Sequence, residues 1–476
     1  MQTQYWQRML IGLGLALTLA APWASATNYY VVTSSQQPSP TPPWTNWGWA
    51  HTNLIEVIAA ARNDDTVYVT NNAVYKLTNQ ITVSYAITVR SWGPDGIMDP
   101  TNTILVGNYP TTTNRHFQLN NSGATLAGFT LTNGWGAPDT NTVSGGSIYL
   151  QSGIVTNCII MRNYALCTNT LYMSYGGGGI LMDGSGNGGV WNCTISSNVV
   201  GRNGGGIFIK SGGSWRIANC TISGNSTTAG AGGGIVAWSS SSAAPVISNC
   251  WVVSNYANSY GGGIYISYST EFRHSLIMGN TVDLYEGGGV RMNGSSLLRN
   301  CLVVNNLAKS THGGGIYINN EASIQNCTIA SNSTGSSGSS GGLRFAGTGG
   351  NIGHPNIENT IIWGNSGGSG VSNLSIYATN STESCVAFTN VCTSPIIVTN
   401  CASWVNTITS DPRFVSAATA DFRLQSDSPC INAGVNRAWM EGALDYYGYR
   451  RIDNFRRTVD IGAYEYLGKG TLFRVH

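Results

Sequence analysis

The sequence predicts an all-β fold, a right-handed parallel β-helix solenoid with an N-terminal helical cap and a small C-terminal capping segment. Two motifs that alternate at a common spacing carry this prediction, together with a composition rich in glycine and poor in charge. The first motif is a run of glycines followed by an aliphatic residue. That residue recurs in steps of 27, 28, 29, 26, 26 and 27 residues, at Ile180, Ile207, Ile235, Ile264, Val290, Ile316 and Leu343.

The second motif is Asn-Cys-x-(Ile/Val)-x-x-Asn, for example from Asn192 to Asn198. It recurs around five further cysteines and has degenerate copies at two other residues: Cys158, Cys220, Cys250, Cys301, Cys327, Ser275 and Thr360. The closing Asn keeps its place in every copy, from Asn163 to Asn365. Each repeat therefore holds at least two short strands separated by turns of Gly, Asn and Ser.

Strand alternation sends Cys193 and Ile195 to one face and Thr194 to the other. Strands this short cannot bury a face alone, and the repeat has no room for a crossover helix of about ten residues. Stacking solves both problems, because each strand pairs in parallel with its copy about 4.8 Å away in the next coil. Crossover chirality favours the right hand. We expect glycine at the tight corners and recurrent Asn to hydrogen-bond along the stack.

The repeating cysteines are expected to form an interior column of free thiols, which pack as small hydrophobic groups. A linear column does not offer the clustered ligands that a metal ion needs, so we expect neither a metal nor a cofactor. Cys167, Cys385, Cys392 and Cys430 lie outside the column. A disulfide between Cys385 and Cys392 is one open alternative.

The composition excludes several classes of protein. Charged residues make up 9% of the chain, against about 25% in an average protein. A net charge of +2 gives no electrostatic footprint for nucleic acid. With 42% hydrophobic and 10% aromatic residues, the chain has enough apolar surface to fold, so disorder is excluded.

Residues 1–26 have the features of a secretory signal peptide: Arg8, an apolar run from Met9 to Ala20, and the Ala24-Ser25-Ala26 cleavage pattern. The run is shorter than the roughly 20 residues of a membrane-spanning helix. We therefore expect a mature chain that begins at Thr27, has no transmembrane segment, and is secreted or held at the cell surface.

The mature chain divides into an N-terminal cap with the first coils (27–107), the repeats (108–410), a C-terminal segment (411–466) and a short tail (467–476). Residues 52–62 predict an amphipathic helix with Leu54, Ile55 and Ile58 on its apolar stripe. The first strands are expected at 66–69 and 81–89. Such a cap covers the unpaired edge of the first coil.

Both ends resemble a known family. The run from Tyr29 to Gly107 looks like exported bacterial pectin-lyase-like β-helix proteins, and motifs such as Asp411–Phe414, Ser428–Gly434 and Val459–Tyr466 resemble the choice-of-anchor segment that ends many of them. The resemblance implies a fold that hosts pectate and pectin lyases, polygalacturonases and many non-enzymes. Function must therefore be argued from the site.

The outward position after each glycine run predicts one surface column: Tyr149, Leu181, Phe208, Val236, Tyr265, Arg291, Tyr317 and Arg344. The neighbouring outward column is Gln151, Asp183, Lys210, Trp238, Ser267, Asn293 and Asn319. Aromatic rings stack on sugars and amides bind hydroxyl groups, so we expect glycan contacts at Tyr149, Phe208, Trp238, Tyr265, Tyr317, Asn293 and Asn319. The alternative is that aromatic residues simply suit an exposed sheet.

Catalysis has weaker support in the sequence. Glycosidases need two carboxylates roughly 5–9.5 Å apart, and no acidic residues occupy equivalent positions in adjacent coils. The candidate catalytic residues are Asp183, Lys210, Arg291 and Arg344, and Asp183 with Lys210 has a surface ion pair as its alternative. We expect a non-catalytic protein that binds polysaccharide or another surface, with a polysaccharide lyase or glycoside hydrolase as the alternative. Nothing in the sequence indicates an oligomeric state.

Overall fold

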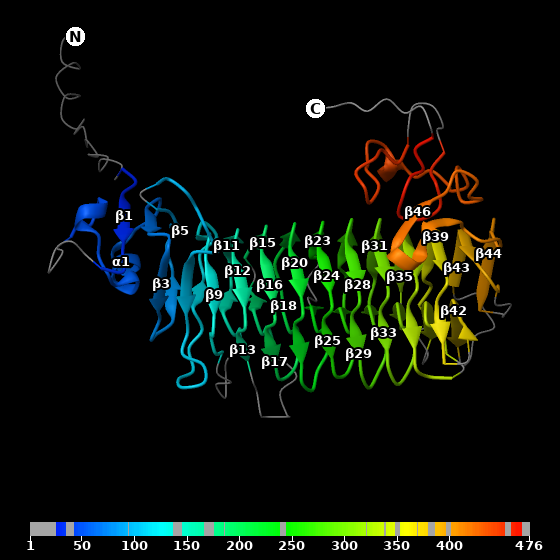
Figure 1. Ribbon diagram of the computed structural model, residues 1–476, viewed down its shortest axis with the longest axis horizontal. Helices are drawn as coiled ribbons and strands as arrows, with labels where there is room; N and C mark the ends of the chain where they lie inside the picture. Colours follow the sequence, from blue (N-terminus) through cyan, green and yellow to red (C-terminus); the bar gives the residue numbers. More distant parts are fainter. Residues whose placement is uncertain are drawn as a thin grey trace, which may run out of the picture.

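The computed structural model describes residues 25–34, 42–93, 95–136, 145–165, 176–184, 186–238, 244–319, 321–337, 339–347, 353–368, 370–378, 386–396, 401–452 and 458–468. Within these ranges the chain forms an elongated solenoid of stacked coils, with the cap at one end and the C-terminal segment over the side of the last coils (Figure 1). Nearly all of the expected signal peptide and the last eight residues of the tail lie outside the described residues, as do Cys167 and Cys385.

A typical coil contains four short strands: β14 (Ile180–Asp183), β15 (Gly188–Trp191), β16 (Thr194–Ser196) and β17 (Val199–Val200). The first strands of the coils form an 11-stranded sheet, here called sheet 1. The second and third strands form a 24-stranded sheet, sheet 2, and the two-residue fourth strands belong to a nine-stranded sheet, sheet 3. The strand pairs between coils of the solenoid body are parallel, as the repeat predicts.

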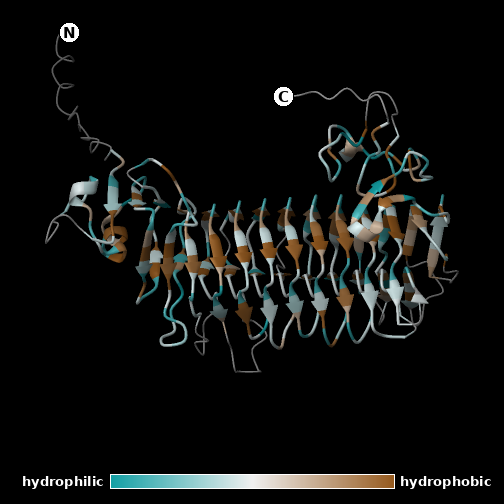
Figure 2. Ribbon diagram, viewed as in Figure 1, coloured by the Kyte–Doolittle hydropathy of each residue, from teal (hydrophilic) through white to brown (hydrophobic). Residues whose placement is uncertain are grey.

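Sheet 1 positions the candidate site. Its strands are β4 (Ile81–Val83), β7 (Phe117–Leu119), β10 (Ile148–Leu150), β14, β18 (Ile207–Ser211), β22 (Ile235–Ala237), β26 (Ile264–Ile266), β30 (Val290–Met292), β34 (Ile316–Ile318), β38 (Leu343–Gly347) and β42 (Leu374–Ala378). The aliphatic residues after the glycine runs pair in register, for example Ile180 with Ile207 and Ile207 with Ile235. The predicted repeat is therefore confirmed. Figure 2 shows that hydrophobic residues follow the strands while the turns are more hydrophilic.

The repeating cysteines form the predicted interior column. All six are free and buried: Cys158, Cys193, Cys220, Cys250, Cys301 and Cys327. The Cys193 sulfur accepts the backbone N–H of Cys158 at 3.4 Å, and the Ser275 hydroxyl takes the same place opposite Cys250 at 3.2 Å. The sulfur atoms of the column therefore pack as apolar groups and also act as weak acceptors for backbone N–H groups.

The closing Asn of each motif forms a continuous buried ladder from Asn163 to Asn373. The Asn198 amide donates to the Asn225 side-chain oxygen at 2.9 Å and to the Ile160 carbonyl at 2.9 Å. The same Asn225 oxygen accepts the backbone N–H of Asn198 at 3.0 Å. Because this pattern repeats, the polar groups of the ladder are hydrogen-bonded although no side chain reaches water. The left-handed backbone position belongs to the first Asn of the motif instead, as at Asn192 (φ 52°).

The glycine runs turn the chain into sheet 1. The first glycine adopts a positive φ, as at Gly204 (φ 66°), which suits glycine because it lacks a Cβ atom. A Cβ on the next residue, Gly205, would lie 2.2 Å from the Gly233 carbonyl oxygen of the following coil. The run therefore serves both as a turn and as a close contact between neighbouring coils.

The helix of the N-terminal cap is shorter than the predicted range of 52–62. Helix α1 (Leu54–Ala60) begins after Asn53, whose side chain accepts the backbone N–H of Ile55 at 3.0 Å. Its buried residues are Leu54, Val57 and Ile58, while Ile55 is only partly buried. The expected strand at 81–89 is two strands, β4 and β5 (Thr88–Ser91), because a turn at 84–87 moves the chain from sheet 1 to sheet 2. The expected strand at 66–69 is β2 (Thr66–Val69), which pairs with β1 (Asn28–Val31).

The C-terminal segment follows β44 (Ala402–Val405) and folds back over the outer side of sheet 2 (Figure 1). It contains an antiparallel hairpin of β45 (Phe414–Ser416) and β46 (Asp421–Leu424). Three of its side chains pack on three outward residues of the solenoid, which are Phe422, Ala463 and Tyr464 with Leu302, Val304 and Ala330. The Arg437 guanidinium also forms an ion pair with the buried Glu358 carboxylate of β39 (Asn356–Trp363).

The disulfide between Cys385 and Cys392, which the sequence left open, is not formed. Cys392 is a free, buried thiol that packs with Leu424 and Cys430 of the C-terminal segment. The Cys430 thiol and burial both raise the pKa of Cys392. Cys401 is disulfide-bonded, and Cys430 is free. In the part of the chain that the structure describes, no helix is long and apolar enough to cross a membrane.

Candidate functional site

The predicted outward column of sheet 1 exists in the expected register. Successive pairs join Tyr149, Leu181, Phe208, Val236, Tyr265, Arg291, Tyr317 and Arg344, and Arg344 pairs with Ser375. Backbone hydrogen bonds between adjacent coils hold the neighbouring column in place. Asn293 N–H donates to the Ile266 carbonyl at 2.8 Å, and Asn319 N–H donates to the Met292 carbonyl at 2.9 Å. The two columns therefore line one face of the solenoid.

The first half of this face is covered. Leu181, Phe208 and Val236 are fully buried, and Tyr149, Trp238 and Tyr265 pack against them. The backbone at Gly176 runs directly over the ring of Phe208, since a Cβ there would lie 2.3 Å from its Cδ1 atom. The expectation that Phe208 is exposed is therefore corrected, and Phe208 cannot contact a ligand in this conformation.

Asp183 and Lys210 form an ion pair, with 3.0 Å between Oδ2 and Nζ. The register differs from the prediction: a bulge after Met182 places Asp183 opposite Ser211, and the Ser211 hydroxyl also donates to the Asp183 carboxylate. Because both oxygens of the Asp183 carboxylate are bonded, the geometry is that of a structural ion pair, which was the alternative interpretation of the sequence. Asp183 does not resemble an acid poised for catalysis.

Arg291 is the centre of the second half of the face. Its guanidinium carbon lies 3.9 Å from the ring centroid of Tyr260, 5.4 Å from that of Tyr317 and 5.8 Å from that of Tyr265. The ring of Tyr285 stacks on Tyr260 at 4.7 Å. Cation–π contacts of this kind hold a guanidinium flat against aromatic faces. We call this group, with the polar residues below, the Arg291 cluster.

Polar contacts fix the orientation of Arg291. Its Nη1 atom lies 2.8 Å from the Glu286 carboxylate, and its Nε donates to the Asn293 oxygen at 3.1 Å. The Asn293 amide in turn donates to the Tyr265 hydroxyl at 2.9 Å. The structure thus brings together Tyr265, Arg291, Asn293 and Tyr317 of the predicted site residues.

Arg344 follows Tyr317 in the column. Its Nη1 donates to the Ser375 hydroxyl at 3.2 Å, and its guanidinium lies 5.4 Å from the centroid of Tyr377, a ring with half of its surface exposed. Its Nε is buried without a hydrogen-bond partner, and among the described residues Arg344 has no ion pair with a carboxylate. Burial lowers the pKa of Arg344, followed by smaller opposing effects of its neighbours.

A third column was missed by the sequence reasoning. The residue immediately before each glycine run also stacks from coil to coil: Ala231, Tyr260, Glu286 and His312 are linked by backbone bonds such as Gly261 N–H to Glu286 O at 3.0 Å. His312 shares a hydrogen bond with the Ser339 hydroxyl, and burial together with the Arg344 charge lowers its pKa. The signal was a fixed offset from the glycine run, the same signal that located the other two columns.

The cluster offers cations, phenol groups and amides. In the described ranges, no three His, Cys, Asp or Glu side chains lie close enough together to hold a metal ion. Burial raises the pKa of the Tyr317 hydroxyl, and the nearby Glu286 charge raises it further. Tyr149 and Trp238 lie apart from the cluster on the covered half, and Asn319 lies one coil beyond Asn293.

Comparisons with solved structures find several similar chains. The pectate lyase Pel9A aligns with a TM-score of 0.45 and 14% identity over 92% of this chain and 96% of that one. XylC in complex with xylose aligns with a TM-score of 0.43 and 10% identity, over 93% of this chain and 99% of XylC. The PL6 family alginate lyase AlyGC aligns with a TM-score of 0.42 and 11% identity, over 88% of this chain and 58% of the lyase. No curated protein matches the chain in sequence.

The family model of the right-handed β-helix region matches residues 50–306, which is more than half of the 476 residues. The matched region begins in the cap and extends through β32 (Leu302–Val304), so it includes the coils that carry Tyr260, Tyr265 and Arg291 but not Tyr317. The repeat, the parallel register and the family match agree, and the chain belongs to the right-handed β-helix family.

Proposed function

We propose that this protein binds an acidic polysaccharide, without cleaving it, on the Arg291 cluster of sheet 1. The observation that carries the proposal is the packing of Arg291 among three tyrosine rings. Beside it lies the guanidinium of Arg344, whose Nε has no hydrogen-bond partner and which has no carboxylate partner among the described residues. Tyr317 is buried, but the partly exposed rings of Tyr260 and Tyr265 offer surface to the apolar side of a sugar. The phenol and amide groups offer partners for its hydroxyl groups. Export, as expected from the first 26 residues, would place the protein where such polymers occur.

The charges favour an acidic polymer over a neutral one. Glu286 neutralises Arg291, whereas Arg344 has only a hydroxyl partner and a buried Nε without a bond. A guanidinium in this state gains most from a carboxylate, since two parallel N–H groups match its two oxygens. A uronate unit over Arg344 supplies that carboxylate, and neighbouring units then extend towards Tyr317 and Tyr265.

The cluster is less suited to hydrolysis. An inverting or retaining glycosidase uses two carboxylates, and the described cluster contains one, Glu286, which is already ion-paired. Arg291 is fixed by its rings and by Asn293, so it is a positioning group and not a proton acceptor.

A polysaccharide lyase is the second candidate function. One observation favours it: Arg344, which could neutralise a uronate, lies beside Tyr317 in register and close to His312. A phenol or imidazole next to such a cation is a possible base for proton removal. Burial, however, raises the pKa of Tyr317, so the phenol stays protonated and cannot take up the proton.

The test is a panel of polygalacturonate, alginate, xylan and cellulose, scored for binding and for unsaturated product on one preparation. We expect uronate polymers to bind without product formation. Arg344→Ala should weaken binding by about tenfold, which is the value of one charged hydrogen bond. Arg216→Ala removes an exposed arginine from sheet 2 and should have no effect. Equal binding by Arg344→Ala and the wild type would overturn the proposal, and unsaturated product would support the lyase.

A further inference from the structure

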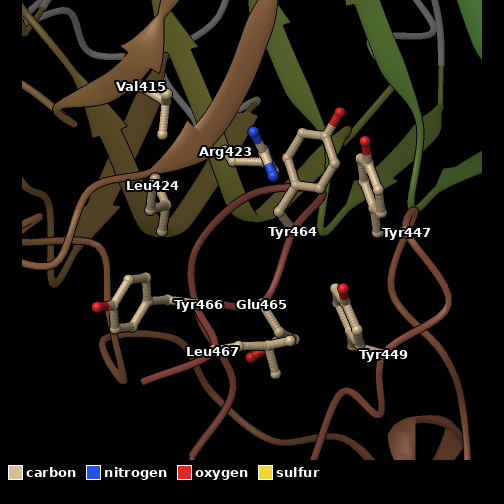
Figure 3. A pocket seen from close by; sticks show the side chains of 9 residues that line it. All are labelled: Val415, Arg423, Leu424, Tyr447, Tyr449, Tyr464, Glu465, Tyr466 and Leu467. Carbon is tan, nitrogen blue, oxygen red and sulfur yellow. The ribbon is translucent and has the colours of Figure 1, made fainter. Parts of the chain in front are cut away.

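The C-terminal segment contains a pocket of about 240 Å³ (Figure 3). This segment packs on sheet 2, whereas the Arg291 cluster lies on sheet 1. Its wall is formed by the β45–β46 hairpin and by the loops near residues 447–449 and 464–467. Four tyrosines line it with one cation and one acid: Tyr447, Tyr449, Tyr464, Tyr466, Arg423 and Glu465. Its volume is below the roughly 300 Å³ at which sites for drug-sized ligands begin, so it suits a small ligand.

Buried carboxylates hold the tyrosines in place. One oxygen of Asp445, a nearly fully buried residue, accepts the backbone N–H groups of Tyr447 and Tyr449, both at 2.8 Å. Its other oxygen accepts the N–H of Glu465 at 2.8 Å, and Asp460 accepts the N–H of Tyr466 at 2.5 Å. The pocket is therefore organised before any ligand arrives, which lowers the entropic cost of binding.

The rings present a continuous aromatic wall. The planes of Tyr447 and Tyr449 differ by 7° with centroids 6.2 Å apart, and Tyr447 lies 5.7 Å from Tyr464 (Figure 3). Tyr447 is 57% exposed, although Tyr464 at its side is buried. A large ring left in water beside a buried one provides surface that a ligand can cover.

The charged groups of the pocket are satisfied within the protein. Arg423 makes two hydrogen bonds to Asp421, at 2.9 and 2.6 Å. Glu465 pairs with the fully buried Arg451 at 2.8 Å. Because both side chains already have partners within the protein, a charged ligand finds no unpaired group of opposite charge here. A neutral ligand leaves these internal pairs intact.

From these observations we infer that the pocket is a second carbohydrate site, which takes one neutral sugar ring or the neutral end of a glycan. The sugar's apolar face packs on the exposed ring of Tyr447, and its hydroxyl groups meet the phenol groups of the pocket. The site is independent of the proposed function, because it lies in another segment, prefers neutral over acidic sugars and does not involve Arg344.

The experiment uses the full exported chain and methyl glycosides of neutral hexoses and pentoses, with binding followed by saturation-transfer NMR and calorimetry. We expect at least one glycoside to bind, and Tyr447→Ala to weaken it about tenfold, or about 1.4 kcal/mol. Tyr447→Phe should keep most of the affinity, since it keeps the ring. Tyr85→Ala, which removes another exposed tyrosine, and Arg344→Ala should both bind as the wild type does.

Two outcomes would overturn the inference: no glycoside binds with saturation, or Tyr447→Ala binds as tightly as the wild type. Preference for a planar aromatic alcohol over every glycoside would also overturn it. Because Tyr447 is largely exposed, its replacement should leave the thermal unfolding midpoint unchanged, which the same samples report. Loss of polygalacturonate binding with retained glycoside binding would reject the proposed function alone.

Discussion

Asn225 donates a hydrogen bond from its side-chain amide to the side-chain oxygen of Asn255, 3.0 Å away in the next coil. The same oxygen accepts the backbone N–H of Asn225, and the Asn255 amide continues the chain of bonds to Asn280. The Asn255 side chain thus satisfies groups of the coil before it and of the coil after it. The ladder makes the stability of each coil depend on its neighbours.

Asn255→Ala should strongly destabilise the solenoid. It removes the acceptor of two Asn225 N–H groups and the donor of the Ile222 carbonyl, all buried. Each unsatisfied buried group costs about 1–3 kcal/mol, so we expect a loss of at least about 3 kcal/mol. The measurement is chemical denaturation followed by circular dichroism. Thr221→Ala, on the outer side of the adjacent coil, is the control and should stay within about 0.5 kcal/mol. Equal midpoints for the two variants would contradict the ladder's role.

Most of the fold could be predicted from the sequence because each coil contacts only its neighbours. A fixed spacing between identical motifs then becomes a contact, as for Cys301 with Cys327 or Tyr265 with Arg291. The missed column of Tyr260, Glu286 and His312 obeys the same rule and could have been found. The cover over Phe208 belongs to that same column, because Gly176 pairs with Asn203 at the position that Ala231 and Tyr260 occupy in later coils.

The docking of the C-terminal segment was also encoded in the repeat. Outward positions of the third strand are Thr194 and Ser196 in one coil but Leu302 and Val304 four coils later. Apolar residues at outward positions indicate a covered surface. Which segment covers them depends on contacts far apart in sequence, such as Asn300 with Leu444, which periodicity does not reveal.

His116 should make the folded protein sensitive to mild acid. It is fully buried; its Nδ1 accepts from the Ser147 hydroxyl and its Nε2 donates to the Thr132 carbonyl. Burial lowers its pKa to about 4, so below the unfolded value of about 6.5 the unfolded chain binds more protons. Stability is therefore lost as the pH falls from about 6.5 to 4, by about 3 kcal/mol in total.

The measurement for His116 is the free energy of unfolding at several pH values across this window. His116→Gln cannot titrate and should show a flatter dependence on pH between 6.5 and 5, whatever its absolute stability. If the two proteins lose stability in parallel over this range, the imidazole is not the group responsible.

Glu286→Gln should strengthen binding of an acidic polysaccharide, if the proposed function holds. The substitution keeps the shape of the side chain but frees the Arg291 charge. We expect roughly threefold tighter binding of polygalacturonate at low ionic strength, with a smaller gain as salt screens the interaction. Glu321→Gln, an exposed acid in a turn, is the control. Weaker binding by Glu286→Gln would mean that this carboxylate contacts the ligand or that its pair with Arg291 is needed.

Arg451→Ala should release the C-terminal segment from the solenoid. The guanidinium is fully buried, donates to the Gly462 and Ala463 carbonyls at 3.0 and 2.8 Å, and pairs with Glu465. Its loss leaves the buried Gly462 and Ala463 carbonyls without their donor, which costs about 1–3 kcal/mol for each group. Limited proteolysis should then cut the segment first, because the solenoid keeps its own ladder and core.

Arg423→Ala is the matched control for Arg451→Ala. It also removes an arginine from the segment, but its pair with Asp421 is half exposed, and such pairs contribute about 0–1 kcal/mol. We therefore expect cleavage of Arg423→Ala at the wild-type rate. Equal protection of both variants would show that the apolar contact of Phe422 and Tyr464 with Leu302 holds the segment without the buried charge. Docking would then depend on the outward apolar residues of the last coils alone.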